Sequence, residues 1–168
     1  GQDSINAGMI ALAIGFLLVI IFMFVKYRFF GLITNATLII NLFILLGVLT
    51  LFEATLTLPG IAGIILTVGM AVDANVLIFE RIKEELKDET NNILAFDGGY
   101  TKSRTAIIDA NITTLLAAVI LFFMGSGPVK GFAVTLGVGI FTTLFSVYFI
   151  ARLFTSLYVS KNKNSGKL

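Results

Sequence analysis

The stretch LTVGMAVDANVLIFERIKEEL, which runs from Leu66 to Leu86, places one acidic residue, Asp73, inside an apolar run before the sequence turns abruptly charged. The apolar part extends back to Pro59 and forward to Phe79. A helix needs about 20 apolar residues to cross the hydrocarbon core of a bilayer, which is about 30 Å thick. The stretch therefore predicts a transmembrane helix that carries a carboxyl group deep in the membrane.

The rest of the sequence has the composition of an integral membrane protein. Of its 168 residues, 57% are hydrophobic and only 13% are charged, and the mean hydropathy is +0.98. A soluble domain has about 25% charged residues. Apolar runs of spanning length predict five transmembrane helices, at residues 5–25, 29–52, 59–79, 106–124 and 129–153. The expected fold class is an all-α, polytopic membrane helix bundle.

The basic residues predict how this bundle is oriented. If the N-terminus lies outside, the connection 80–105 and the basic tail 154–168 are cytoplasmic, and Lys130 is the only one of the 12 Lys and Arg residues outside. The opposite orientation would reverse that distribution, so the positive-inside rule favours an outside N-terminus and a cytoplasmic C-terminus. The net charge of +2 then reflects topology, and no nucleic-acid partner is expected.

Missing residue types exclude several kinds of chemistry. The sequence has no Cys and no His, which excludes disulfides, thiolate metal sites and the usual side-chain pH switch. It also has no phosphate-binding Gly loop followed by Lys, and no nucleophile with a histidine base. We therefore expect no enzyme activity, no metal and no cofactor, and any proton chemistry must use carboxylates.

Asp73 is the candidate for such chemistry. At 1.5 Å per residue it lies about 21 Å from the outer end of its span and about 12 Å from the charge at Arg81. An ionised carboxylate at that depth costs about 2.5 to 3.5 kcal/mol on insertion scales, so the side chain must face protein or water. A proton pathway requires a group that holds a proton while it is shielded from water and releases the proton when water reaches it. The alternative is a structural carboxyl that hydrogen-bonds a neighbouring helix.

Helical spacing predicts which residues of the third span share a helix face with Asp73. Ala62, Leu66, Gly69 and Glu80 fall near the face of Asp73, so small residues allow a helix or water to approach it. Asn75 lies about 200° away and is expected to contact a different helix. Glu80, beside Arg81, is expected to form an ion pair at the membrane edge. The alternative is that Glu80 receives protons that leave Asp73, because it shares the face of Asp73.

The tripeptide Asp-Ala-Asn of the third span is repeated near the start of the fourth. There Asp109 lies close to the cytoplasmic boundary, where exposure costs less than at the depth of Asp73. Asp109, Asn111 and Thr113 are therefore candidates for helix contacts or for polar groups that support the proton site. In the fifth span, Gly131, Gly137 and Gly139 are expected to allow close helix packing.

The connection 80–105 is more than a plain linker. Ile93, Phe96 and Tyr100 form a narrow apolar stripe at helical spacing. This segment is expected either to lie along the membrane surface or to pack as a short helix on the ends of its own spans.

Long phrases of the sequence resemble a known family. They are LTLPGIAGIILTVGMAVDANVLIFERIKEEL (56–86), DANITTLLAAVILFFMGSGPVKGFAVTLGVGIFTTLF (109–145) and the opening GQDSINAGMIA (1–11). These phrases, in this order, resemble the transmembrane region of the SecD branch of the SecD/SecF protein-export family, within the resistance-nodulation-division superfamily. The resemblance covers essentially the whole chain.

This resemblance implies a function and partners. Family members of the SecD branch pair with SecF, associate with the SecYEG channel and YajC, and use the proton-motive force to pull preprotein that the SecA motor has delivered. They are multi-pass proteins of the bacterial inner membrane, in contact with its lipids. Asp73, in the VDAN motif, matches the family's intramembrane proton-pathway carboxylate, which works with an acid and an arginine of SecF.

The resemblance also implies what the sequence lacks. Family members have six spans and a large periplasmic domain between the first and second, so residues 1–168 are expected to be the membrane domain without the first span and the periplasmic domain. Two other functions share this membrane architecture. One is a lipid or small-molecule exporter of the same superfamily, and the other is a structural scaffold of the translocon, in which Asp73 would carry no proton.

Overall fold

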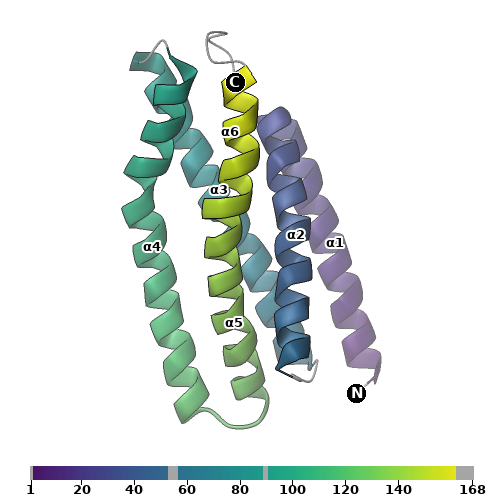
Figure 1. Ribbon diagram of the computed structural model, residues 1–168. Coiled ribbons are helices and arrows are strands. Elements are labelled where there is room, and N and C mark those ends of the chain that lie inside the picture. The colour runs from purple at the N-terminus through teal and green to yellow at the C-terminus, as the bar shows by residue number, and fades with distance from the viewer. Residues whose placement is uncertain (1, 53–56, 89–90, 162–168) are drawn as a thin grey trace.

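The chain folds into an antiparallel bundle of long helices, seen in Figure 1, a computed structural model that describes residues 2–52, 57–88 and 91–161. The helices are α1 (Gln2–Tyr27), α2 (Phe29–Leu51), α3 (Leu58–Asp88), α4 (Asn92–Met124), α5 (Pro128–Phe145), the π-helical segment η1 (Ser146–Ala151) and α6 (Arg152–Lys161). Segments α5, η1 and α6 follow one another as a single run. Within the described residues, five helical runs are long and apolar enough to cross a membrane, which confirms the predicted fold class.

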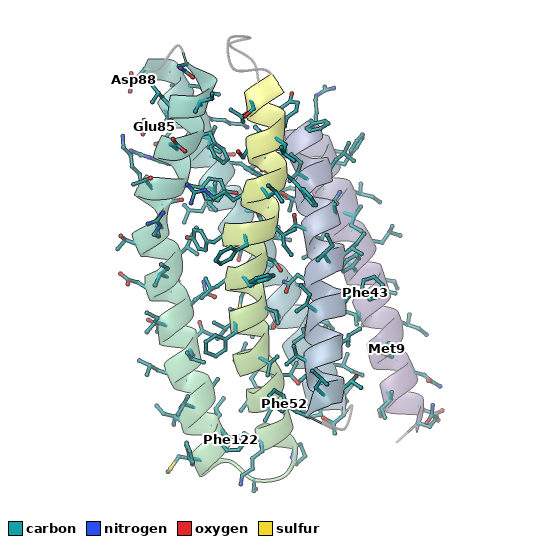
Figure 2. The ribbon with its side chains drawn as sticks, in the orientation of Figure 1. Met9, Phe43, Phe52, Glu85, Asp88 and Phe122 are labelled. Carbon is teal, nitrogen blue, oxygen red and sulfur yellow. The ribbon has the colours of Figure 1, made fainter. Side chains whose placement is uncertain are left out.

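Helix α3 is the centre of the bundle. It packs against α1, α4 and α5, and the largest core cluster includes its residues Val68, Ile78, Phe79 and Ile82. Helix α1 is the least covered of the five runs. An apolar surface that is left exposed in this way is the normal outer face of a bundle in lipid, and Figure 2 shows Met9 and Phe43 pointing outward from α1 and α2.

Two tight turns fix the helix order. Helices α1 and α2 are joined through Arg28 alone, and a Cβ on Gly31 would collide with the backbone carbonyl of Met23. At the other end of the bundle, α4 and α5 are joined through Gly127, which has a φ of 52°. Glycine adopts this left-handed region without the steric penalty that a side chain brings, and Pro128 then starts α5 with its φ already helical.

The helices extend beyond the predicted spans. Helix α3 continues past Phe79 to Asp88, and α4 starts at Asn92 rather than at residue 106, so most of the described part of the connection 80–105 is helical. Phe96 and Tyr100 are buried in the main core cluster. Of the two alternatives for this segment, it therefore packs on the ends of its own spans. The helices extend because apolar residues at helical spacing continue into these charged segments.

The predicted basic tail, residues 154–168, begins before the last helix ends at Lys161. Residues 154–161 continue the last helical run, and Thr155 and Val159 are almost fully buried. Phe154 and Tyr158 pack against the main core cluster, which explains why these residues are helical. Residues 162–168 of the predicted tail lie outside the described residues.

Candidate functional site

Asp73 lies in the middle of α3 on a face that no other described helix covers. Its side chain is exposed, although α3 is the central helix of the bundle. Ala62, Leu66 and Leu77, one to three turns away on the same face, are exposed as well. A Cβ added to Gly69 would meet no atom within 4 Å. Most of the face predicted from helical spacing is therefore uncovered, from Ala62 to Leu77, and we call this stripe the Asp73 face. Glu80, which is predicted on the same face, is half-buried and contacts α1.

Asp73 also borders a small cavity between α3 and α4. The cavity has a volume of about 180 Å³. Its lining residues are Met70, Asp73, Ala74 and Leu77 of α3, and Ala106, Ile107, Ala110, Asn111 and Thr114 of α4. Three of these lining residues are alanines. Among the described residues, the polar side chains that line the cavity are the carboxyl of Asp73, the amide of Asn111 and the hydroxyl of Thr114. The cavity is large enough for a few water molecules.

Asp73 has no hydrogen-bond or ion-pair partner among residues 2–52, 57–88 and 91–161. In the part of the chain that the structure describes, no basic side chain lines the cavity beside Asp73. A charged carboxylate that faced lipid at the centre of a bilayer would cost about 2.5 kcal/mol or more. The site therefore requires a proton on Asp73, water from the cavity, or a second protein chain that covers the Asp73 face.

Asn75 has the opposite environment. Its side chain is 2% exposed, and its Nδ2 donates to the carbonyl of Ala71, 3.0 Å away in the same helix. Helical spacing predicts that Asn75 and Asp73 lie on different faces, and in the structure Asn75 is buried and Asp73 is exposed. The side-chain hydrogen bond of Asn75 does not reach a second helix, because the carbonyl one turn back is within its range.

The repeated tripeptide in α4 contributes two residues to the cavity, Ala110 and Asn111. Asn111 lines it, and its Nδ2 donates to the carbonyl of Ile107 over 2.8 Å. Asp109 and Thr113 are exposed and do not line the cavity. The Thr113 hydroxyl donates to the backbone carbonyl of Asp109 over 2.9 Å, so the two residues are linked through the backbone and not through the carboxylate.

The expected ion pair between Glu80 and Arg81 does not form. Glu80 accepts a hydrogen bond of 2.7 Å from the hydroxyl of Tyr27 and lies 3.6 Å from Lys26 and 3.8 Å from Lys83. Arg81 instead pairs with Glu84 and Glu85, at 2.6 and 3.3 Å. Adjacent side chains on a helix diverge by about 100°, which directs Glu80 to α1 and Arg81 elsewhere.

Sequence reasoning missed the contribution of Thr114 and Ala110 to the cavity. Thr114 lies three residues after Asn111 and donates to the carbonyl of Ala110 over 3.0 Å. The spacing of Asn111 and Thr114 marks one helix face. Which face of α4 turns to Asp73 depends on the packing of α3 on α4, which no local pattern contains.

Comparisons with known proteins agree with this architecture. The family model described as "Protein export membrane protein SecD/SecF, C-terminal" matches residues 1–161. The chain is 56% identical over 152 residues to the protein translocase subunit SecD of Desulfurispirillum indicum, covering 90% of this chain and 30% of that protein. It is 51% identical over 170 residues to the subunit of the same name from Rickettsia prowazekii, covering 100% of this chain and 33% of that protein.

Solved structures give the same result. The crystal structure of SecDF, a translocon-associated membrane protein from Thermus thermophilus, superposes with a TM-score of 0.92 at 42% sequence identity, covering 96% of this chain and 22% of that one. A structure of SecDF in its super-membrane-facing form has a TM-score of 0.90 at 41% identity, covering 97% of this chain and 22% of that one. The chain spans about a third of the length of the curated relatives it matches. With matches along nearly all of its length, the chain belongs to the SecD/SecF family of protein-export membrane proteins and corresponds to the transmembrane region of SecD.

Proposed function

We propose that this chain is the proton-coupling membrane region of a bacterial protein-export subunit, with Asp73 as the group that binds and releases the proton. The observation that carries the proposal is the placement of Asp73 on the uncovered Asp73 face, beside a cavity that can hold water. Relatives over 50% identical are named protein translocase subunit SecD, which supports preprotein translocation as the work that the proton drives.

The uncovered face supports SecF as the partner that completes the site. A carboxylate in the bilayer needs a cover of protein or water, and Asp73 has no partner in the described part of this chain. The related structures carry SecD and SecF together, as the name SecDF states. In the proposed complex, SecF packs on the Asp73 face and supplies charged groups to Asp73. The assembly associates with the SecYEG channel and with YajC.

The proposed cycle uses one protonation step. A proton from the outer side neutralises Asp73, which lowers the cost of burying the carboxyl against SecF and favours one arrangement of the two bundles. Release toward the cytoplasm restores the charge and the other arrangement. One charge that crosses 100 mV yields about 2.3 kcal/mol, which shifts a two-state equilibrium by about 50-fold.

The charges at one end of the bundle support the predicted orientation. Contacts bring Lys26, Lys83 and Glu80 together, and Lys102 reaches Glu85 at 2.6 Å. Figure 2 shows Glu85 and Asp88 at the end where the described chain finishes, and Phe52 and Phe122 at the other. We propose that this basic end is cytoplasmic and that the membrane is the bacterial inner membrane.

Export measurements on the Asp73→Asn variant of the full-length protein test this proposal. The amide keeps the size of the side chain and cannot ionise, so we expect the gradient-dependent part of late preprotein translocation to fall at least tenfold, with membrane insertion unchanged. Asp109→Asn is the matched control, because Asp109 is exposed and outside the cavity, and it should retain most of the export. Full gradient-dependent export by Asp73→Asn would instead indicate a scaffold without proton coupling.

A further inference from the structure

A second, larger cavity lies at the basic end of the bundle, away from Asp73. It lies where the turn between α1 and α2 meets α3 and α6, and its volume is about 380 Å³. Lys26, Arg28 and Lys83 line it together with the aromatic rings of Phe29 and Tyr158. The proposed proton site uses none of these residues.

The charge of this cavity is strongly positive. Lys26 and Lys83 share a single carboxylate, that of Glu80, at 3.6 and 3.8 Å. Arg28 forms no ion pair with any residue that the structure describes. Three cations thus face one carboxylate, whose Oε1 also accepts the hydroxyl of Tyr27. The cavity can accept an anion without breaking a strong ion pair.

The backbone at Arg28 is unusual. Its φ is 54°, and among the described residues it is the only non-glycine residue with a positive φ. This region favours glycine, and a long side chain there adds a steric cost. A strained residue beside a cavity is a common mark of a binding site. Arginine at this position adds a third cation to the cavity.

An apolar groove continues from the basic cavity along the outer surface of α2 and α6. It has a volume of about 340 Å³ and shares Phe29 and Tyr158 with the basic cavity. These two rings stack with their centroids 4.1 Å apart. The other lining residues are Leu32, Ile33, Ala36, Phe154 and Leu157. Phe29, Leu32 and Leu157 are about half exposed, so the groove opens toward lipid.

We propose that the basic cavity and the apolar groove together bind one anionic phospholipid. The headgroup phosphate is held by Lys26, Arg28 and Lys83, and an acyl chain lies along the groove between α2 and α6. Basic pockets between helices on the cytoplasmic side are suited to anionic headgroups, and aromatic side chains are typical of the level where headgroup meets hydrocarbon. An amphiphile fits both halves of the surface, whereas free phosphate would leave the groove unused.

Native mass spectrometry of the full-length protein in detergent tests this site. Dioleoylphosphatidylglycerol is the probe, and dioleoylphosphatidylcholine and inorganic phosphate are the comparison ligands. Each attractive cation contributes about 1 kcal/mol near such a surface, so Arg28→Gly should weaken phosphatidylglycerol binding about fivefold. Glycine suits the positive φ, so the melting temperature should not fall, and a loss of binding cannot be ascribed to misfolding.

Three further variants separate charge from shape. Arg28→Lys should retain most of the binding, and Lys130→Gln, at the other end of the bundle, should leave it unchanged. Ala36→Phe fills the exposed groove and should weaken binding of the long-chain lipid by a comparable factor. The proposal is wrong if phosphatidylcholine binds equally well, if millimolar inorganic phosphate displaces the lipid, if Arg28→Gly or Ala36→Phe has no effect, or if a segment of a partner protein occupies the groove.

Discussion

Two tyrosine hydroxyl groups in the bundle have opposite surroundings. The hydroxyl of Tyr27 donates to Glu80 over 2.7 Å and thereby ties α1 to α3. The hydroxyl of Tyr148 is buried without a hydrogen-bond partner among the described residues. A hydrogen bond to a charged group stabilises more than a neutral one, and a buried hydroxyl without a partner destabilises.

The two Tyr→Phe variants should therefore differ. Tyr27→Phe removes the bond to Glu80 and should lower the free energy of unfolding by about 1 kcal/mol. Tyr148→Phe removes an unpaired hydroxyl and should be neutral or slightly stabilising. Thermal unfolding of the full-length protein in detergent, followed by circular dichroism, measures both. A larger loss for Tyr148→Phe than for Tyr27→Phe would contradict the hydrogen-bond assignment.

At the level of single residues, the sequence predicts that Asp73 and Asn75 lie on different faces of the helix. It does not predict that Glu80 and Arg81 pair with different residues. The first prediction depends only on the helix period, which is local. Besides the local Lys83, the partners of Glu80 are Lys26 and Tyr27, which lie more than fifty positions earlier in the chain. They become neighbours only because α1 packs on α3, so the pattern around Glu80 could not predict them.

At the scale of elements, the contact of α3 with α5 depends on glycine. A Cβ on Gly139 would overlap the hydroxyl of Thr67 and lie 2.7 Å from its Cγ2. A Cβ on Gly137 would find its nearest neighbour 4.0 Å away, on Leu115. The sequence predicts close packing at these two glycines and at Gly131, and the closest approach of the three is at Gly139.

Alanine substitution should distinguish the two glycines. Gly139→Ala overpacks the contact of α5 with α3 and should destabilise by about 1 to 3 kcal/mol, whereas Gly137→Ala should cost little. Adding Thr67→Ala to Gly139→Ala should recover most of the loss, because the threonine supplies the overlapping atoms. Melting temperatures of the single and double variants measure this. Equal losses at both glycines, or no recovery in the double variant, would show that the contact is looser than described.

The helices themselves could be predicted, but their ends could not. Apolar length identifies all five runs because a bilayer imposes a minimum. The extensions of α3 and α4 carry charged residues and that of α6 is rich in hydroxyl residues. They are helical because one side packs on the core, as Phe96, Tyr100 and Val159 do. Hydropathy averages both sides of a helix and so ends these elements too early.

At the scale of the whole molecule, the uncovered Asp73 face should be an interface with SecF. The chain has no cysteine, so single cysteines can be placed in a cysteine-free full-length background. Leu66→Cys and Leu77→Cys, both on the Asp73 face, should cross-link to cysteines introduced in SecF. Phe43→Cys is the control, because it is 71% exposed on the outer surface of α2. Cross-linking from Phe43→Cys alone would place SecF on another surface.

The sequence predicts that Asp73 lies deep in the membrane, but not what covers it. Depth follows from counting residues along a helix. The surroundings of the Asp73 carboxyl depend on a second chain and on the cavity that Asp73 shares with Asn111 and Thr114. This cavity forms only when α4 packs on α3. Depth therefore identifies the candidate residue, and the assembly determines how it works.

Proton flux through the reconstituted full-length complex with SecF shows whether Asp73 binds and releases the transported proton. A pH-sensitive dye inside proteoliposomes reports the flux when a gradient is imposed across the membrane. We expect Asp73→Asn to reduce the flux at least tenfold and Asp109→Asn to leave it nearly unchanged, with both variants assembled normally. Wild-type flux through Asp73→Asn would contradict the assignment of Asp73 as the proton-binding group.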